Sequence, residues 1–214
     1  VLAGNQYIAD YLNQSGVKIL KVPTSLKLDD YQARKSQRTY SNFTICWVGT
    51  PNTWEQCFVP FLKIFLELAD KYAIQFVIIG TKGNGFSNEK FFFYDWSESN
   101  EVELIKSCHI GIMPLPDTPW MRGKSGYKLI QYMSCDLPVI ASAVGENINL
   151  VQHGVDGFLV KNESDWERYI LCIMENKELQ LSLQRNARQK AEDSFDVKKN
   201  ALIIAKHIRK VLRK

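Results

Sequence analysis

The feature that most constrains the fold is a series of short apolar runs separated by segments with helical spacing. These runs lie at residues 43–49, 76–80, 91–93, 110–115 and 138–142. They are rich in β-branched and aromatic residues and end near Gly or Pro, as is typical of buried strands in a parallel sheet. After Gly49 the spacing of apolar residues predicts a helix despite Pro60, with Asn52 or Thr53 as its cap. Alternating strands and helices predict an α/β domain with three layers, a Rossmann-like fold and a mainly parallel sheet.

Composition limits the classes of function. The chain has 214 residues and 45% hydrophobic content, which is enough for one large or two small domains. A net charge of +4 is too small to indicate a nucleic-acid partner. No apolar run has the length of a membrane span, and the first residues do not resemble a signal peptide. The odd number of cysteines, without metal-type clustering, indicates reduced structural thiols, so we expect a cytoplasmic protein.

The segment that follows Gly123 combines a helix with a second, polar stripe. The apolar stripe comprises Tyr127, Ile130 and Met133, and Pro138 rules out continuation of the helix. The second stripe, at positions i, i+4, i+7 and i+11, comprises Lys124, Lys128, Gln131 and Cys135. A helix between two buried strands has little structural reason to carry two lysines, so this segment is the best candidate for a functional site.

The start of this helix is a candidate anion site. Backbone N–H groups in the run 123–126 are free of helical partners and lie at the positive end of the helix dipole. The two glycines allow a ligand to approach the backbone closely, and Lys124 and Lys128 would pair with a diphosphate. The alternative is that both lysines simply extend to solvent. Together, the strand, the glycine-bearing turn and the cationic helix favour the anion site.

A second candidate position is the turn Gly49-Thr50, which follows the first buried strand. Open α/β sheets bind ligands at the carboxyl ends of their strands. No basic residue follows this turn before Lys63, so Lys124 and Lys128 would have to supply the positive charge. No histidine has a nucleophile or metal partner visible in the sequence, and no metal site is predicted.

Three stretches together resemble the donor-binding half of a family 4 glycosyltransferase, a retaining enzyme of the two-domain GT-B fold. The family pattern is E-G-F-G-x-x-x-x-E, then A-M-A-x-G-x-P-V-[IV]-A-[ST], and later h-G-x-x-G-x-L-V. The matching stretches are Gly123 to Gln131, Tyr132 to Ser142 and His153 to Val160. The first family Glu is replaced by Gly123, and the Glu that typically binds the donor ribose is replaced by Gln131. This departure is similar to a branch of the family with R-G-K-x-x-x-K-x-x-Q-Y-M.

The resemblance implies a division of the chain into three parts. Residues 1–40 resemble the junction that leaves an N-terminal acceptor domain, and residues 41–195 resemble the donor-nucleotide-binding domain. Residues 196–214 would form a helix that packs back toward the acceptor domain, which we expect to lie outside this sequence. The catalytic residues are unknown and are expected in that N-terminal domain.

The resemblance also implies a function. The enzyme would transfer a hexose from a nucleoside diphosphate sugar to a hydroxyl acceptor with retention, in polysaccharide or glycoconjugate synthesis. We expect no cofactor and no metal ion, and we expect this chain alone to be inactive. The basic face of the last helix leaves peripheral association with the inner face of a membrane open. The expected contacts to the donor diphosphate and nucleotide are Gly49, Thr50, Lys124, Ser125, Gly126, Lys128 and Gln131.

Two residues are weaker candidates for contacts to the base or the sugar. Trp96 follows the strand at 91–93, where similar enzymes hold the nucleobase, but an aromatic residue at a strand end more often packs in a core. Asp117 lies in the loop before the cationic helix, and ordinary solvation explains it equally well.

Two other functions remain open. A sugar-nucleotide 2-epimerase shares the GT-B architecture, although it would be expected to hold carboxylates and histidines in its cleft. A non-catalytic nucleotide-sugar-binding module is favoured by the replacement of both family glutamates.

Overall fold

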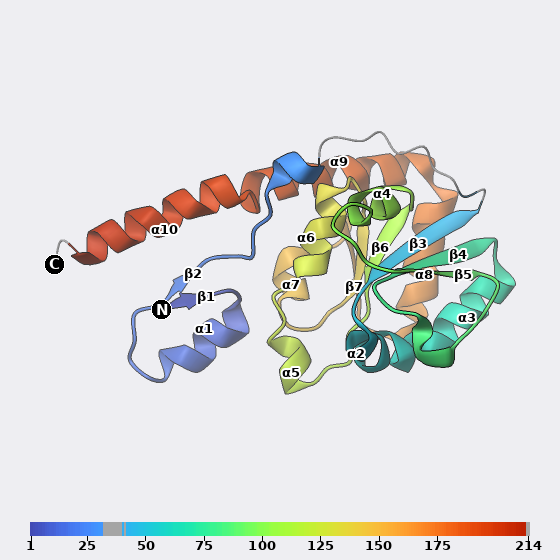
Figure 1. Ribbon diagram of the computed structural model, residues 1–214, viewed down its shortest axis with the longest axis horizontal. Coiled ribbons are helices and arrows are strands. Elements are labelled where there is room, and N and C mark those ends of the chain that lie inside the picture. Colours follow the sequence, from blue (N-terminus) through green and yellow to red (C-terminus); the bar gives the residue numbers. More distant parts are fainter. Residues whose placement is uncertain (32–39, 41, 213–214) are drawn as a thin grey trace.

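The computed structural model describes residues 1–31, 40 and 42–212, which form a small N-terminal unit and a larger α/β domain (Figure 1). The N-terminal unit comprises β1 (Leu2–Ala3), α1 (Gln6–Asn13) and β2 (Leu20–Lys21). Its two strands pair in parallel and form a sheet of their own. The sequence predicts a junction at residues 1–40, and the structure shows that its first part forms a compact βαβ unit.

The larger domain is built on a parallel sheet that has six strands within the described residues. The strands are β3 (Phe43–Val48), β4 (Ile74–Ile79), β5 (Phe91–Tyr94), β6 (Ile110–Met113), β7 (Val139–Ser142) and β8 (Gly157–Val160). Their order is β5-β4-β3-β6-β7-β8, and every neighbouring pair is parallel. The order of the chain therefore reverses between β3 and β6, where open α/β sheets bind ligands.

Helices cover both faces of this sheet and complete the three layers (Figure 1). The helices of the larger domain are α2 (Pro51–Thr53), α3 (Leu62–Lys71), α4 (Glu101–Lys106), α5 (Pro119–Arg122), α6 (Tyr127–Ser134), α7 (Asn147–Leu150), α8 (Glu163–Glu175) and α9 (Lys177–Ser194). Along β3, Cys46 and Val48 pack in one core with α4, α6 and α9, whereas Ile45 and Trp47 pack in a second core with α3 and α8. The prediction of a three-layer, Rossmann-like α/β domain is confirmed.

The segment after β3 is less regular than its apolar spacing predicts. Thr50, and not Asn52, caps α2, and the side chain of Thr53 completes a capping box with it. Beyond α2 the chain forms a π turn at 54–58 and a 3-10 turn at 59–61 before α3 begins. Pro60 lies in that 3-10 turn, because a proline has no N–H to donate within a continuous α-helix.

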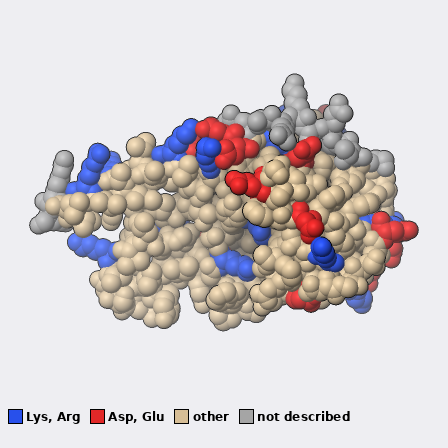
Figure 2. Space-filling model, in the orientation of Figure 1, with Lys and Arg blue, Asp and Glu red and all other residues tan. Residues whose placement is uncertain are grey.

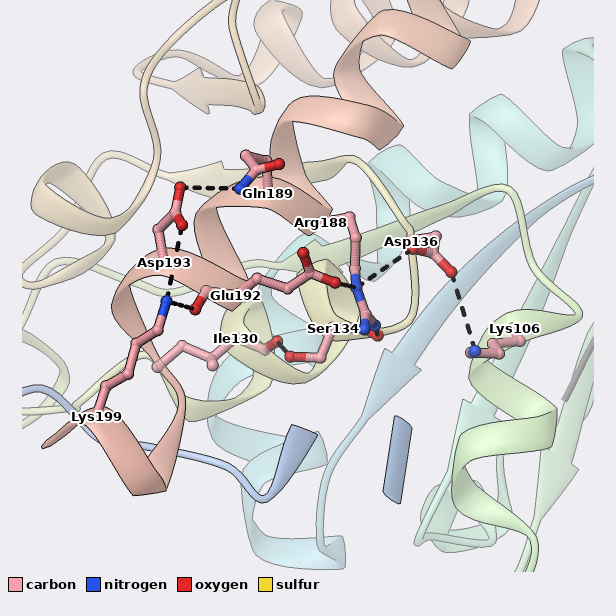
Figure 3. A network of polar contacts seen from close by, with 9 residues as sticks. All are labelled: Lys106, Ile130, Ser134, Asp136, Arg188, Gln189, Glu192, Asp193 and Lys199. Atoms are coloured by element: carbon pink, nitrogen blue, oxygen red, sulfur yellow. Dashed lines mark hydrogen bonds and ion pairs between the residues drawn. The ribbon is translucent and has the colours of Figure 1, made fainter. Parts of the chain in front are cut away.

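Helix α6 is fixed to the sheet near its middle and to α9 at its end. The Val48 N–H donates to the buried Tyr132 hydroxyl oxygen at 2.9 Å. A Cβ at Gly111 of β6 would overlap the Tyr132 ring, so this glycine lets α6 lie close to the sheet. At the other end of α6, Arg188 of α9 donates to the Ser134 carbonyl and pairs with Glu192 and Asp136 (Figure 3). A cation there complements the negative end of the helix dipole.

Helix α10 (Val197–Leu212) leaves the larger domain and extends beside the N-terminal unit (Figure 1). At its start, the Leu26 N–H donates to the Phe195 carbonyl and the Val197 N–H donates to the Leu26 carbonyl, both at 2.9 Å. The segment that leaves the N-terminal unit and the start of α10 therefore run together. Exposed apolar side chains of α10 include Leu202, Ile203, Ile208, Val211 and Leu212. Within the described residues, none of the helices combines the length and apolar character needed to cross a membrane.

Candidate functional site

The candidate site lies where the carboxyl ends of β3 and β6 meet. Gly49 and Thr50 follow β3 directly, as the sequence predicts, and Gly80 at the end of β4 packs against them. A Cβ at Gly80 would lie 2.5 Å from the Gly49 carbonyl oxygen. The protein uses the N–H groups of both predicted residues: Gly49 donates to the Ile79 carbonyl at 2.9 Å, and Thr50 donates to the Thr53 hydroxyl at 2.8 Å. A ligand at this turn would therefore meet a close-packed surface.

The loop that precedes α6 supplies free donors. Gly126 caps α6 in the left-handed conformation, with φ of 69°, and a Cβ there would overlap Leu150 of α7. Glycine is therefore the residue that fits this position. In the part of the chain that the structure describes, no acceptor is bonded to the N–H groups at positions 125–128. These four amides lie at the positive end of the α6 dipole, at the position where the sequence predicts an anion site.

Lys128 lies in the first turn of α6, but Lys124 lies in the loop before it and not, as the sequence predicts, on the helix, because the left-handed Gly126 separates the two. Neither lysine forms an ion pair with a described residue. Burial lowers the pKa of Lys128, the Glu101 carboxylate opposes this effect, and the charge of Lys124 adds to it. Both lysines also lower the pKa of the Cys57 thiol, which burial raises, so both charges lie near Cys57. Figure 2 shows basic side chains in a hollow on this face of the molecule. The alternative that both lysines extend freely to solvent does not describe Lys128.

Gln131, one turn further along α6, is 1% exposed. Its Nε2 donates to the Tyr31 hydroxyl at 3.4 Å, while its Oε1 is buried and has no partner among the described residues. Burial raises the pKa of Tyr31, so its hydroxyl keeps its proton. Tyr31 ends the 3-10 turn Leu28–Tyr31 in the connection between the two parts of the molecule. An unpaired buried acceptor is costly, and a ligand hydroxyl could satisfy it.

Trp96 lines a groove beside α6. The groove has a volume of about 730 Å³, and its walls include Tyr31, Glu101 and Tyr127. Trp96 is 56% exposed, so the alternative that it packs in a core is wrong. The groove is thus open to a planar ring that stacks on an aromatic side chain.

Asp117 already forms an ion pair with Arg122. Arg122 donates to both of its carboxylate oxygens, from Nε at 2.6 Å and from the second guanidinium nitrogen at 2.9 Å. This pairing holds the pKa of Asp117 below its usual range. A contact from Asp117 to a sugar would therefore compete with Arg122.

Sequence reasoning missed the contribution of α1. A second groove, of about 780 Å³, lies between α1 and α5 and leads to Lys124. Tyr7 and Tyr11 of α1 and Trp120 of α5 line it with exposed aromatic rings. No local pattern in the sequence indicates this pairing, because the two helices are more than 100 positions apart.

Within the described residues, metal-ligand side chains do not gather at this site. Among the described residues, no three His, Cys, Asp or Glu side chains lie close enough together to hold a metal ion.

Comparison with known proteins places the fold. A model of the family described as glycosyl transferases group 1 matches residues 42–176. Sucrose-phosphate synthase from Thermosynechococcus elongatus is similar in structure, with a TM-score of 0.79 and 17% identity over 100% of this chain and 58% of that chain. Anabaena Alr3699/HepE, solved with UDP and glucose, has a TM-score of 0.79 and 17% identity over 98% of this chain and 62% of its own.

A glycosyltransferase from Rickettsia africae has a TM-score of 0.82 and 14% identity over 100% of this chain and 64% of its own. The chain thus spans about three fifths of the length of these proteins. No curated protein sequence matches it.

Proposed function

The chain belongs to the glycosyl transferases group 1 family, and from this we propose that it is the donor-binding part of a retaining hexosyltransferase. The whole enzyme would transfer a hexose from a nucleoside diphosphate sugar to a hydroxyl acceptor in polysaccharide or glycoconjugate synthesis. The acceptor domain would precede this chain, and α10, with its exposed apolar side chains, would contact it.

The observation that carries the proposal is the pair Lys124 and Lys128 beside the free amides at 125–128. When a glycosidic bond to a diphosphate breaks, negative charge develops on the leaving phosphate oxygens. Fixed donors and cations around that position stabilise the transition state. Helix amides and lysines supply both. We propose that they hold the diphosphate without a metal ion or other cofactor.

The groove beside α6 would take the nucleoside. Trp96 would stack on the base, and the unpaired Gln131 Oε1 would accept a hydrogen bond from a ribose hydroxyl. Since the Anabaena neighbour was solved with UDP, we propose UDP as the first nucleotide to test. We also propose that the enzyme acts in the cytoplasm, at the inner face of a membrane.

Calorimetric titration with UDP, ADP, GDP and the matching nucleosides tests the proposal. We expect one diphosphate to bind, and we expect a chelator to leave its affinity unchanged. Lys124→Ala should lower the affinity for the diphosphate by roughly one to two decades, as expected for the loss of a charge-assisted hydrogen bond. The affinity for the nucleoside should change little. Lys63→Ala is the control, because the Lys63 side chain is 89% exposed on α3.

If none of the diphosphates binds, or if Lys124→Ala binds as tightly as the parent, this site is not the donor site. For the whole enzyme, sugar transfer would support the proposal. Epimerisation of the sugar, or binding without turnover, would contradict it.

A further inference from the structure

The N-terminal unit reaches the proposed diphosphate site through Asn5. This residue is fully buried, and it occupies the cap position of α1. Its Oδ1 accepts a hydrogen bond from the Ile8 N–H at 2.8 Å, as expected of a helix cap. Its Nδ2 donates to the carbonyl oxygens of Gly123 at 2.7 Å and Lys124 at 3.2 Å. One side chain thus begins α1 and also holds the loop that leads into α6.

These two bonds orient the free amides of the loop. A trans peptide is planar, with its C=O and the next N–H on opposite sides. When Asn5 holds the Lys124 carbonyl on the side of α1, the Ser125 N–H is directed to the other side. Within the described residues that N–H has no acceptor. The direction of a proposed ligand donor therefore depends on a side chain about 120 positions earlier in the chain.

Other contacts hold the same loop and the start of α1 together. Gly145, with φ of 55°, lies so close to the loop that a Cβ there would be 2.6 Å from the Arg122 carbonyl oxygen. The next residue, Glu146, is buried, and its Oε2 accepts from the Gln6 N–H at 3.1 Å and from Asn149 at 3.0 Å. The loop is thus enclosed by the start of α1 on one side and by the turn between β7 and α7 on another.

We propose that Asn5 is a positioning residue for diphosphate binding. It acts through the Gly123 and Lys124 carbonyls, which fix the Ser125 amide and the backbone that carries the Lys124 side chain. This inference rests on the proposed function, because it assigns the geometry of that site to the N-terminal unit.

Asn5→Ser separates the two roles of the side chain. Serine is also a good helix cap, so the bond from Ile8 is kept. However, serine has no amide nitrogen, and its hydroxyl is too close to the backbone to hold both loop carbonyls. Asn5→Thr is the second variant, since threonine is also a helix cap, lacks the side-chain amide and adds no charge near the diphosphate. The matched control is Asn176→Ser at the cap of α9, where the Asn176 side chain accepts from the Leu179 N–H at 2.9 Å.

Titration with UDP, inorganic pyrophosphate and uridine then tests the proposal on the full chain. We expect both Asn5 variants to lose about tenfold in affinity for UDP and pyrophosphate, the effect of about one well-placed hydrogen bond. Uridine should bind as it does to the parent, and Asn176→Ser should match the parent with all three ligands. A general loosening of the fold would weaken uridine binding as well. The ratio of the UDP affinity to the uridine affinity therefore distinguishes a positioning role from an effect on stability.

The outcomes separate this inference from the proposed function. If the parent binds UDP and the Asn5 variants bind it equally well, the positioning role is wrong and the proposed function stands. An equal loss for UDP and uridine would also overturn the positioning role. If the parent binds neither UDP nor pyrophosphate, the proposed function is wrong, and the positioning role falls with it.

Discussion

Replacing Lys128 by Met should weaken diphosphate binding and, at the same time, stabilise the protein. Methionine keeps the long apolar stem and removes the charge. If Lys128 contacts the diphosphate, the variant loses a charge-assisted hydrogen bond worth roughly 1.5–3 kcal/mol. That free energy corresponds to about one to two decades in affinity for UDP. Uridine, which carries no phosphate, should bind as tightly as before.

The gain in stability follows from the lowered pKa of Lys128. Burial disfavours its charged form in the folded protein, and no described carboxylate pairs with it. The unfolded chain keeps a pKa near 10.5, so between the lowered pKa and this value the unfolded state binds more protons. The free energy of unfolding therefore rises with pH through this window, and the full penalty is present below it. Met removes the penalty, and a relief of about 1 kcal/mol would raise Tm by about 2–4 °C in a chain of this size.

The assay combines calorimetry with thermal unfolding near pH 7 and again near pH 10. Lys63→Met is the control, because the exposed Lys63 side chain should change neither UDP affinity nor Tm. The parent should lose UDP affinity as Lys128 loses its proton at high pH, whereas Lys128→Arg should keep its affinity there. The reasoning is refuted if Lys128→Met binds UDP as tightly as the parent, or if its Tm falls.

Two other substitutions test the surroundings of the site. Tyr132→Phe should lower the free energy of unfolding by roughly 1–3 kcal/mol, because it leaves the buried Val48 N–H unpaired; urea denaturation measures this, and an unchanged midpoint would contradict it. Gln131→Ala should weaken the binding of UDP and of uridine alike, because the proposed contact is to the ribose that both ligands share. Titration with both ligands measures this, and a loss confined to UDP would contradict the ribose contact.

The sheet could be predicted because most of its strands have a local signal in the sequence. Residues of β3 and β4 are buried on both faces, so each strand is a nearly continuous apolar run. Strand β8 has only four residues, and the sequence indicates it only through the resemblance of His153 to Val160 to the family pattern. Helices α5 and α7 have four residues each, which is too short for a helical period to be recognised.

The candidate site was predictable to the extent that its residues lie on one helix. Lys128 and Gln131 are three positions apart on α6, and this spacing places them on one face of the helix. Lys124 lies in the loop before α6, so its predicted place on the same helical stripe is wrong. Tyr31 and Asn5 were not predictable, because the hydrogen bonds from Gln131 to Tyr31 and from Asn5 to Gly123 span 100 and 118 positions. No local spacing records such pairs, since they depend on how the N-terminal unit packs on the larger domain.

The bridge at Leu26 has a mechanical consequence. The segment that leads from the N-terminal unit to the larger domain is joined to the start of α10 by the two hydrogen bonds of Leu26, by the bond from Asn200 to the Ser25 hydroxyl and by the ion pair of Lys198 with Asp29. Because these contacts are spread over several residues of each segment, the two segments are expected to move together. A partner that moves α10 would therefore also pull on the segment that ends at Tyr31, and through the Tyr31 hydroxyl on the buried Gln131 side chain.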